Sequence, residues 1–238
     1  MREIPANLQV IAFDADDTLW MNEPIFQEVE HRVEEILGSY LPQPNLKTEL
    51  YAREKVNLAL FGYGAKGFVL SLIETAIQLT EGRITADDIH RIIEMGKEML
   101  SRPIELLPGV AHALHELEEK YPLMLLTKGD LLDQESKLAR SGLARHFRYV
   151  EIVSEKHPQA YQDILTRNQI AADRFLMVGN SVKSDILPVI EIGGHAIHVP
   201  YHTTWVHEQV ADSERAESPF VTMQNMEEVL NSLYPGHS

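Results

Sequence analysis

Asp14 and Asp16 are the first residues of the chain whose type and spacing indicate chemistry. They stand in the stretch FDADDTL, residues 13–19, directly after the largely apolar residues 8–13. Such a run is typical of a buried strand, so both carboxylates are expected at its end. Carboxylate oxygens are ligands that Mg²⁺ prefers, and an aspartate can also form an aspartyl phosphate as a nucleophile. Two aspartates spaced by one residue can divide the work of a reaction between them.

Five more polar residues stand at or just beyond the ends of later apolar runs: Thr127, Lys128, Lys156, Asn180 and Asp185. Parallel strands place their carboxyl ends at one edge of a sheet, so residues this far apart in sequence are expected to meet in one crevice. A lysine charge and a threonine hydroxyl suit phosphoryl oxygens, whereas carboxylate and amide oxygens suit Mg²⁺. The set therefore indicates phosphoryl chemistry assisted by magnesium.

The elements that must position these residues alternate along the chain. After the first strand, short and mostly apolar runs predict strands at 123–127, 148–153, 174–179 and 194–199. Helical patterns begin at 109 and cover 131–141, 158–168 and 184–192, with a short helix at 225–234. Strands that alternate with helices in this way predict an α/β fold with a doubly wound parallel sheet.

Residues 21–105 break the alternation. They hold helical patterns without a convincing strand, at 24–38, 46–60, 67–80 and 86–100. We interpret this segment as an inserted all-helical cap domain, and residues 1–20 and 106–238 as the α/β core. Open α/β sheets bind ligands at their carboxyl edge, so the cap is expected to cover that edge.

Four motifs now stand in order, each at a predicted strand end: FDADDTL, LLTKGD, SEKHP and GNSVKSD. In this order they resemble the haloacid dehalogenase superfamily of phosphohydrolases, and the helical insert after the first motif is similar to that family's cap. The resemblance covers the whole Rossmann-like core. It implies a phosphatase that is Mg²⁺-dependent and acts on a small phosphomonoester through an aspartyl phosphate.

The resemblance also implies a role for each matching residue. Asp14 would be the nucleophile, and Asp16 would protonate the leaving oxygen and later activate water. Thr127 would hydrogen-bond a phosphoryl oxygen, and Lys156 would neutralise charge between the nucleophile and the phosphoryl group. Mg²⁺ would be held by Asp14, the Asp16 carbonyl, and Asn180 and Asp185 of the fourth motif.

Two positions bear on the kind of chemistry. The family's fourth motif usually begins Gly-Asp, but Asn180 follows Gly179 here, which removes one formal charge and predicts weaker binding of Mg²⁺. Relatives that cleave carbon–halogen bonds lack the second aspartate, because a halide needs no proton. The presence of Asp16 therefore favours phosphate esters.

Three residues are candidates for substrate binding. Lys128 either contacts substrate or phosphate or is a surface residue. The glycine-rich segment GYGAKG, residues 62–67, is either a break between helices or a cap loop that brings Tyr63 and Lys66 to the substrate. Simpler interpretations exist for the motif residues as well: the aspartates could form a turn, as we expect for Asp17, and Lys156 could be a solvated charge.

Composition narrows the classes of partner. The chain has 36 acidic and 21 basic residues, a formal charge of -15, which argues against sequence-independent binding to nucleic acid or to an anionic membrane. It has no cysteine, so it has no disulfide, no thiolate nucleophile and no zinc–thiolate site. We expect a cytoplasmic enzyme for a small phosphorylated metabolite. A phosphoryl transferase or mutase acting on a sugar phosphate is also compatible with the motifs, as is a non-catalytic binding or regulatory protein with weakened metal binding.

Overall fold

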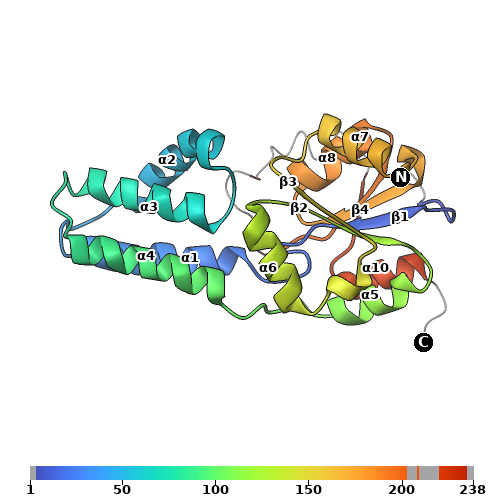
Figure 1. The fold of residues 1–238 in the computed structure, drawn as a ribbon, viewed down its shortest axis with the longest axis horizontal. Helices are drawn as coiled ribbons and strands as arrows, with labels where there is room; N and C mark the ends of the chain where they lie inside the picture. Colours follow the sequence, from blue (N-terminus) through green and yellow to red (C-terminus); the bar gives the residue numbers. More distant parts are fainter. Residues whose placement is uncertain (1–3, 203–207, 209–219, 235–238) are drawn as a thin grey trace. The chain divides into compact units, whose positions relative to one another are not determined.

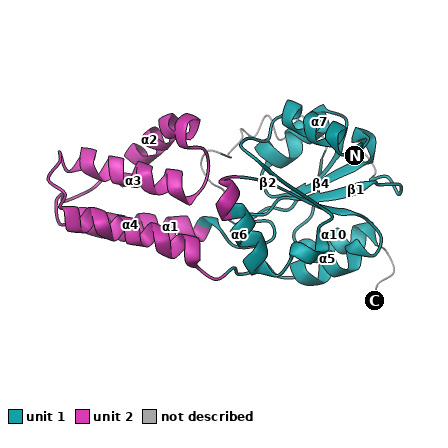
Figure 2. Cartoon of the chain, viewed as in Figure 1, with its two compact units in different colours: residues 1–23, 104–128, 134–238 teal, residues 24–103, 129–133 magenta. Residues whose placement is uncertain are grey.

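Two compact units make up the chain, in a computed structural model that describes residues 4–202, 208 and 220–234. Unit 1 comprises residues 1–23, 104–128 and 134–238, and unit 2 comprises residues 24–103 and 129–133 (Figure 2). The boundaries lie within a few residues of the expected core and cap. The difference is the short segment 129–133, which begins with the last two residues of the second motif and belongs to unit 2.

Unit 1 is built on a parallel six-stranded sheet in the order β3-β2-β1-β4-β5-β6 (Figure 1). Its strands are β1 (Val10–Phe13), β2 (Leu123–Lys128), β3 (Tyr149–Val153), β4 (Phe175–Gly179), β5 (His195–His198) and β6 (Val221–Thr222). The predicted α/β fold with a doubly wound parallel sheet is confirmed. Only β6 was not predicted, because two residues are too short for a recognisable pattern.

Helices cover both faces of this sheet because alternate strand residues point to opposite sides. On one face, Ile11 and Phe13 pack with residues of α5 (Val110–Glu118), α6 (Leu131–Ser141) and α10 (Met226–Leu233). On the other, Val10 and Ala12 pack with residues of α7 (Pro158–Arg167) and α8 (Leu187–Glu191). Figure 1 shows α5 and α10 on the face opposite α7 and α8. Strands buried on both sides explain the continuous apolar runs in the sequence.

One predicted helix is partly wrong. Instead of a single helix over 184–192, a π-type turn spans Val182–Ile186 and α8 begins only at Leu187. The hydroxyl of Ser181 accepts a hydrogen bond from Ser184 N at the start of this turn. Single turns of this type are frequent at functional sites, and here the turn carries Asp185.

Unit 2 consists of α1 (Glu23–Leu37), α2 (Leu46–Phe61), α3 (Ala65–Leu79) and α4 (Ala86–Ser101). Their inward residues, among them Val33, Leu50, Leu72 and Ile92, form a separate buried cluster. The side chain of Thr85 caps α4 by accepting from Asp88 N. Unit 2 therefore has its own hydrophobic core, as expected for an inserted helical domain.

The connection from β1 to unit 2 is fixed by Asp17, which has a φ of 60°. Its carboxylate accepts hydrogen bonds from the backbone N–H groups of Asn22 and Glu23, where α1 begins. Trp20, in the same connection, is fully buried in the core of unit 1. Asp17 thus shapes the turn, as the sequence predicts, and the core extends a few residues past the expected boundary.

Within the described part of the chain, no helix combines the length and the apolar character that crossing a bilayer requires.

Candidate active site

Four of the predicted site residues, Asp14, Lys156, Asn180 and Asp185, lie together at the carboxyl ends of β1 and β4, which are neighbours in the sheet. Asp14 directly follows β1 and donates its backbone N–H to Val178 O of β4 at 2.9 Å. Asn180 directly follows β4. In the strand order of this sheet, the chain reverses its direction of progress between β1 and β4. Ligands of doubly wound sheets bind at such a reversal.

A buried ion cluster occupies this edge. The Lys156 ammonium lies 2.5 Å from Asp14 Oδ1 and 2.7 Å from Asp185 Oδ1. The side chains of Lys156 and Asp185 are each 1% exposed, and that of Asp14 is 10% exposed. Lys156 is therefore not a solvated surface charge. One ammonium contacts two carboxylates, so the cluster carries one negative charge in excess when both carboxylates are ionised.

This arrangement changes the proton affinity of the cluster. Burial raises the pKa of Asp14 to about 7, and Asp185 adds to that effect, while Lys156 opposes it. For Lys156, burial disfavours the charged form, but the attraction of Asp14 and Asp185 outweighs it and raises the pKa above its ordinary value. The lysine thus stays charged, and the carboxyl of Asp14 takes up a proton more readily than an ordinary aspartate does.

Thr18 links the first and fourth motifs. Its hydroxyl lies 3.2 Å from Asp14 Oδ2 and 3.3 Å from Asn180 Oδ1, so its one proton can be donated to either oxygen. The same hydroxyl accepts from Asn180 N at 3.1 Å. Because both oxygens lie near a single atom, the Asp14 carboxylate and the Asn180 amide face the same small region.

Gly179 is required by the position of Asp185. A Cβ atom at residue 179 would overlap the Asp185 carboxylate, so no other residue type fits without displacing that side chain. Asp185 Oδ2 accepts from Ser181 N at 3.0 Å, and its Oδ1 accepts from Lys156. The glycine of the fourth motif therefore allows Asp185 to pack against the end of β4.

Asp16 lies apart from this cluster of contacts. Its carboxylate accepts hydrogen bonds from Trp20 Nε1, Gln134 Nε2 and Lys137 Nζ. Its side chain is 23% exposed, more than that of Asp14. The candidate acid–base residue and the candidate nucleophile are thus held by different sets of partners.

Thr127 and Lys128 end β2, next to β1. Thr127 is 1% exposed, and we find no direct link to Asp14 in the described residues. The Lys128 side chain is 14% exposed, so it is not a surface residue. Its ammonium donates to Ser184 Oγ at 3.1 Å and to the Glu208 carboxylate. A role of Lys128 in substrate binding stays a prediction.

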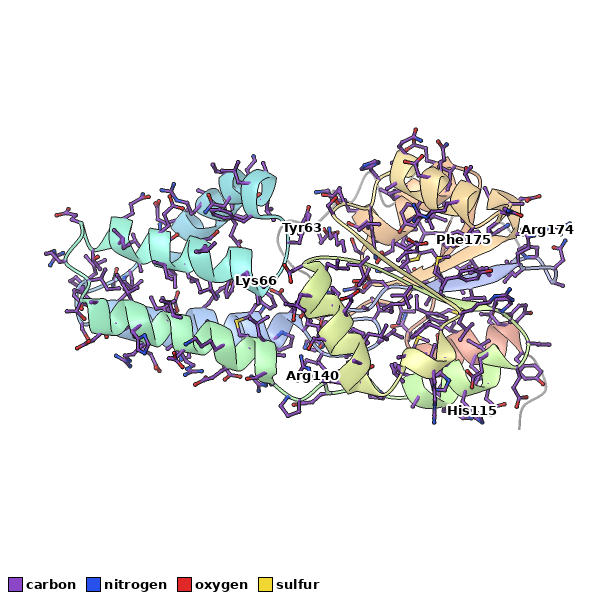
Figure 3. The ribbon with its side chains drawn as sticks, in the orientation of Figure 1. Tyr63, Lys66, His115, Arg140, Arg174 and Phe175 are labelled. Carbon is purple, nitrogen blue, oxygen red and sulfur yellow. The ribbon has the colours of Figure 1, made fainter. Side chains whose placement is uncertain are left out.

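Tyr63 and Lys66 belong to unit 2. Figure 3 shows them in the loop that leads into α3 and in the first turn of α3. Gly62 and Gly64 on either side of Tyr63 have φ values of 69° and 113°, which favour glycine. The Lys66 ammonium lies 2.8 Å from Asp130 Oδ1 in the same unit. Contact of either side chain with substrate stays a prediction.

The donor set at the edge fits a hard divalent cation. Within the described residues, no group of three His, Cys, Asp or Glu side chains forms a complete cage for a metal. Mg²⁺, however, takes few protein oxygens and keeps waters. The excess negative charge around Asp14 and Asp185, with the amide oxygen of Asn180 nearby, matches that requirement.

Sequence reasoning missed Thr18, Trp20, Gln134 and Lys137 as site residues. Thr18 stands in the first motif four residues after Asp14, which was an available signal. Gln134 and Lys137 stand three residues apart on α6, a spacing that puts them on one helix face. Polar residues on an amphipathic helix are ordinarily assigned to the solvent side, so no signal in the sequence directed them to Asp16.

The comparisons with known proteins agree on one family. A model of the haloacid dehalogenase-like hydrolases matches residues 8–193. A haloacid dehalogenase-like family hydrolase from Xanthomonas campestris is 41% identical with a TM-score of 0.85, over 95% of this chain and 91% of that one. A search of curated proteins gave no match.

Two more distant solved structures share the fold. A 2-haloacid dehalogenase from Pseudomonas syringae pv. Tomato is 20% identical with a TM-score of 0.63, over 95% of this chain and 98% of that one. A predicted phosphoglycolate phosphatase from Haemophilus somnus is 17% identical with a TM-score of 0.63, over 94% of this chain and 97% of that one. At these identities the likeness concerns the fold alone.

Proposed function

The chain belongs to the haloacid dehalogenase-like hydrolases, and from that premise we propose that it is a Mg²⁺-dependent phosphatase. Its substrate is a small phosphomonoester, a phosphorylated metabolite of the cytoplasm, and the reaction passes through an aspartyl phosphate on Asp14. The family membership supports hydrolysis. The choice of phosphate ester is our proposal.

The observation that supports a phosphate ester as substrate is the second carboxylate, Asp16. It stands two residues after the buried Asp14 and is held by three side chains. An alkoxide leaving group needs a proton, which a carboxyl group at this position can supply. A halide leaving group has no such need, so an organised Asp16 supports an ester as substrate.

The chain's residues would act in two steps. In the first, an Asp14 oxygen bonds to phosphorus, the bond from phosphorus to the leaving oxygen breaks, and Asp16 gives its proton to that oxygen. In the second, a water oxygen bonds to phosphorus, the bond to Asp14 breaks, and Asp16 takes a proton from the water. Each residue returns to its initial state, and inorganic phosphate is released.

Lys156 and Thr127 supply electrostatic stabilisation. The transition state of phosphoryl transfer is loose and highly charged, so a fixed positive charge and hydrogen-bond donors lower the barrier. Lys156 is already in contact with Asp14, and its charge is secured by two carboxylates. Thr127 is a buried residue at the end of β2, and its hydroxyl, which lies 3.5 Å from Lys128 O, would donate to a phosphoryl oxygen.

Mg²⁺ would be held by the Asp14 and Asp185 carboxylates, the Asn180 amide oxygen and the Asp16 carbonyl. When bound, it would neutralise phosphoryl charge and orient the phosphoryl group. The excess negative charge of the buried cluster supports this assignment.

Carbon–halogen hydrolysis is the second candidate, because a 2-haloacid dehalogenase shares the fold. The test measures phosphate release from 4-nitrophenyl phosphate with Mg²⁺ and halide release from 2-chloropropionate, for the wild type and Asp14→Asn. We expect phosphate release that is lost in the variant. Halide release without phosphate release would identify a dehalogenase.

A phosphoryl transferase and a non-catalytic protein would each give a distinct result in such assays. A phosphoryl transferase or mutase would pass the phosphoryl group to an added sugar hydroxyl faster than to water. A binding or regulatory protein would show no turnover, and Asp14→Asn would then behave like the wild type with both substrates.

A further inference from the structure

Four hydrogen bonds converge on the Asp16 carboxylate. Trp20 Nε1 donates to Oδ1 at 2.8 Å, and Gln134 Nε2 donates to Oδ2 at 2.8 Å. Lys137 Nζ lies 3.0 Å from Oδ1 and 3.3 Å from Oδ2, so it bridges both oxygens. All four contacts are donated to the carboxyl oxygens of Asp16, and together they fix the plane and the position of its side chain.

These donors are themselves held in place. Lys137 also donates to Asn22 Oδ1 at 2.8 Å, and its side chain is 13% exposed. Trp20 is fully buried. Gln134 and Lys137 come from α6, more than a hundred residues after Asp16. The Asp16 side chain is thus tied to the helix that follows the second motif and cannot turn freely.

Gln134 carries a second sign of a functional position. It is 2% exposed, and its Oε1 atom is buried with no hydrogen-bond partner among the described residues. An unpaired buried acceptor is unfavourable, and each such atom in a native structure calls for an explanation. The amide orientation in which Nε2 donates to Asp16 and lies 3.4 Å from Lys128 O leaves Oε1 facing no donor among the described residues.

We propose that Lys137 and Gln134 are positioning residues for Asp16, which they hold where it can exchange a proton with the leaving oxygen and then with water. This inference rests on the proposed phosphatase function. Lys137 compensates the charge that appears on Asp16 when the proton leaves. Gln134 fixes the direction of the second oxygen. Neither residue touches the phosphoryl group.

The two half-reactions depend on Asp16 to different extents, and this gives a specific signature. 4-Nitrophenol leaves readily without a proton, so misplacing Asp16 affects mainly the water step. In Lys137→Met we expect a rapid burst of 4-nitrophenolate, about one per active site, followed by turnover about 10- to 100-fold slower than in the wild type. Phenyl phosphate has a poorer leaving group. Its turnover by the variant should fall about tenfold more than that of 4-nitrophenyl phosphate, and it should show no burst.

Matched variants separate positioning from folding. Gln134→Met should show the same burst and leaving-group dependence, and Lys137→Arg should restore part of the turnover. Lys55→Met, an exposed lysine of α2, should match the wild type. The signature in Lys137→Met or in Gln134→Met supports the inference.

Other results overturn it. Wild-type turnover in both variants, or equal losses on the two esters without a burst, would show that Lys137 and Gln134 do not position Asp16 although the enzyme is a phosphatase. Failure of the wild type to hydrolyse either ester would overturn the proposed function itself, and the inference with it.

Discussion

Lys156 lies against Asp14, with its ammonium 2.5 Å from Asp14 Oδ1, although the two residues are 142 positions apart in the chain. The contact joins the loop after β3 to the end of β1 across the carboxyl edge of the sheet. The same ammonium also holds Asp185. This one buried cation therefore organises three of the four motifs.

Removing that cation should damage both stability and activity. In Lys156→Met, two buried carboxylates lose their shared partner, and breaking a buried pair costs about 3–5 kcal/mol. We expect the free energy of unfolding to fall by that amount in urea titrations, and turnover to fall at least ~100-fold. Lys55→Met is the surface control. A variant with the stability and turnover of the wild type would show that the cluster has no such role.

Asn180 should weaken the binding of Mg²⁺. An amide oxygen contributes no formal charge, and affinity for hard cations depends on the number of charged ligands. Asn180→Asp is therefore expected to bind Mg²⁺ roughly tenfold more tightly in isothermal titration calorimetry. Binding in the wild type that is equal to or tighter than in the variant would contradict the assignment of residue 180 as a ligand.

Lys66 should affect the choice of substrate more than the chemistry. Its contact with Asp130 lowers the pKa of that carboxyl through a hydrogen bond. We expect Lys66→Ala to change the kcat/KM ratio between phosphorylated metabolites by about tenfold, and to leave turnover of 4-nitrophenyl phosphate nearly unchanged.

Asp130→Asn is the matched control, because it removes the charge that pairs with Lys66, keeps the lysine, and keeps an oxygen that can accept from Asp133 N at the start of α6. It should preserve the ranking of substrates. The same change of ranking in both variants would mean that the ion pair, and not a contact of Lys66 with substrate, determines the effect.

Glu30 should make stability depend on pH. Burial raises its pKa to about 7, with help from Glu54 and against the attraction of Lys47. The folded chain then binds this proton more tightly than the unfolded chain does, so the contribution of Glu30 to stability falls as pH rises from about 4.5 to about 7. Above that range the loss is complete.

Glu30→Gln removes this effect. The full shift would be worth about 3 kcal/mol, and partial exposure reduces it to about 1–2 kcal/mol. We expect the free energy of unfolding of the variant, measured by urea titration, to exceed that of the wild type by this amount at pH 8. At pH 5 the difference should be smaller. Glu119→Gln, at an exposed position, is the control. An equal difference at both pH values would rule out titration of Glu30 as the cause.

Much of the fold was predictable because its signals are local. Buried parallel strands leave apolar runs, and β2 to β5 lie within two residues of the predicted ranges. The same logic brought Asp14, Lys156 and Asp185 to one edge of the sheet. The order of the four motifs along the chain indicated the family, which the comparisons confirm.

The remainder depends on contacts between distant segments. The π-type turn at Val182–Ile186 lies where Asp185 packs against Gly179 and Lys156. The helical periodicity of the sequence does not show that Asp185 makes these contacts. The partners of Asp16 come from a helix whose polar residues resemble an ordinary solvent face. Such contacts depend on where α6 lies relative to the loop after β1, which a single sequence does not reveal.

The central claim is that Asp14 becomes phosphorylated during turnover. The most direct measurement is mass spectrometry of the peptide that contains Asp14 after an acid quench of Lys137→Met during its burst with 4-nitrophenyl phosphate, beside Asp14→Asn and the wild type. We predict that Asp14 carries the mass of one phosphoryl group, in an amount that follows the burst. Release of 4-nitrophenolate by the wild type, with no phosphoryl group on Asp14 in any sample, would contradict the account.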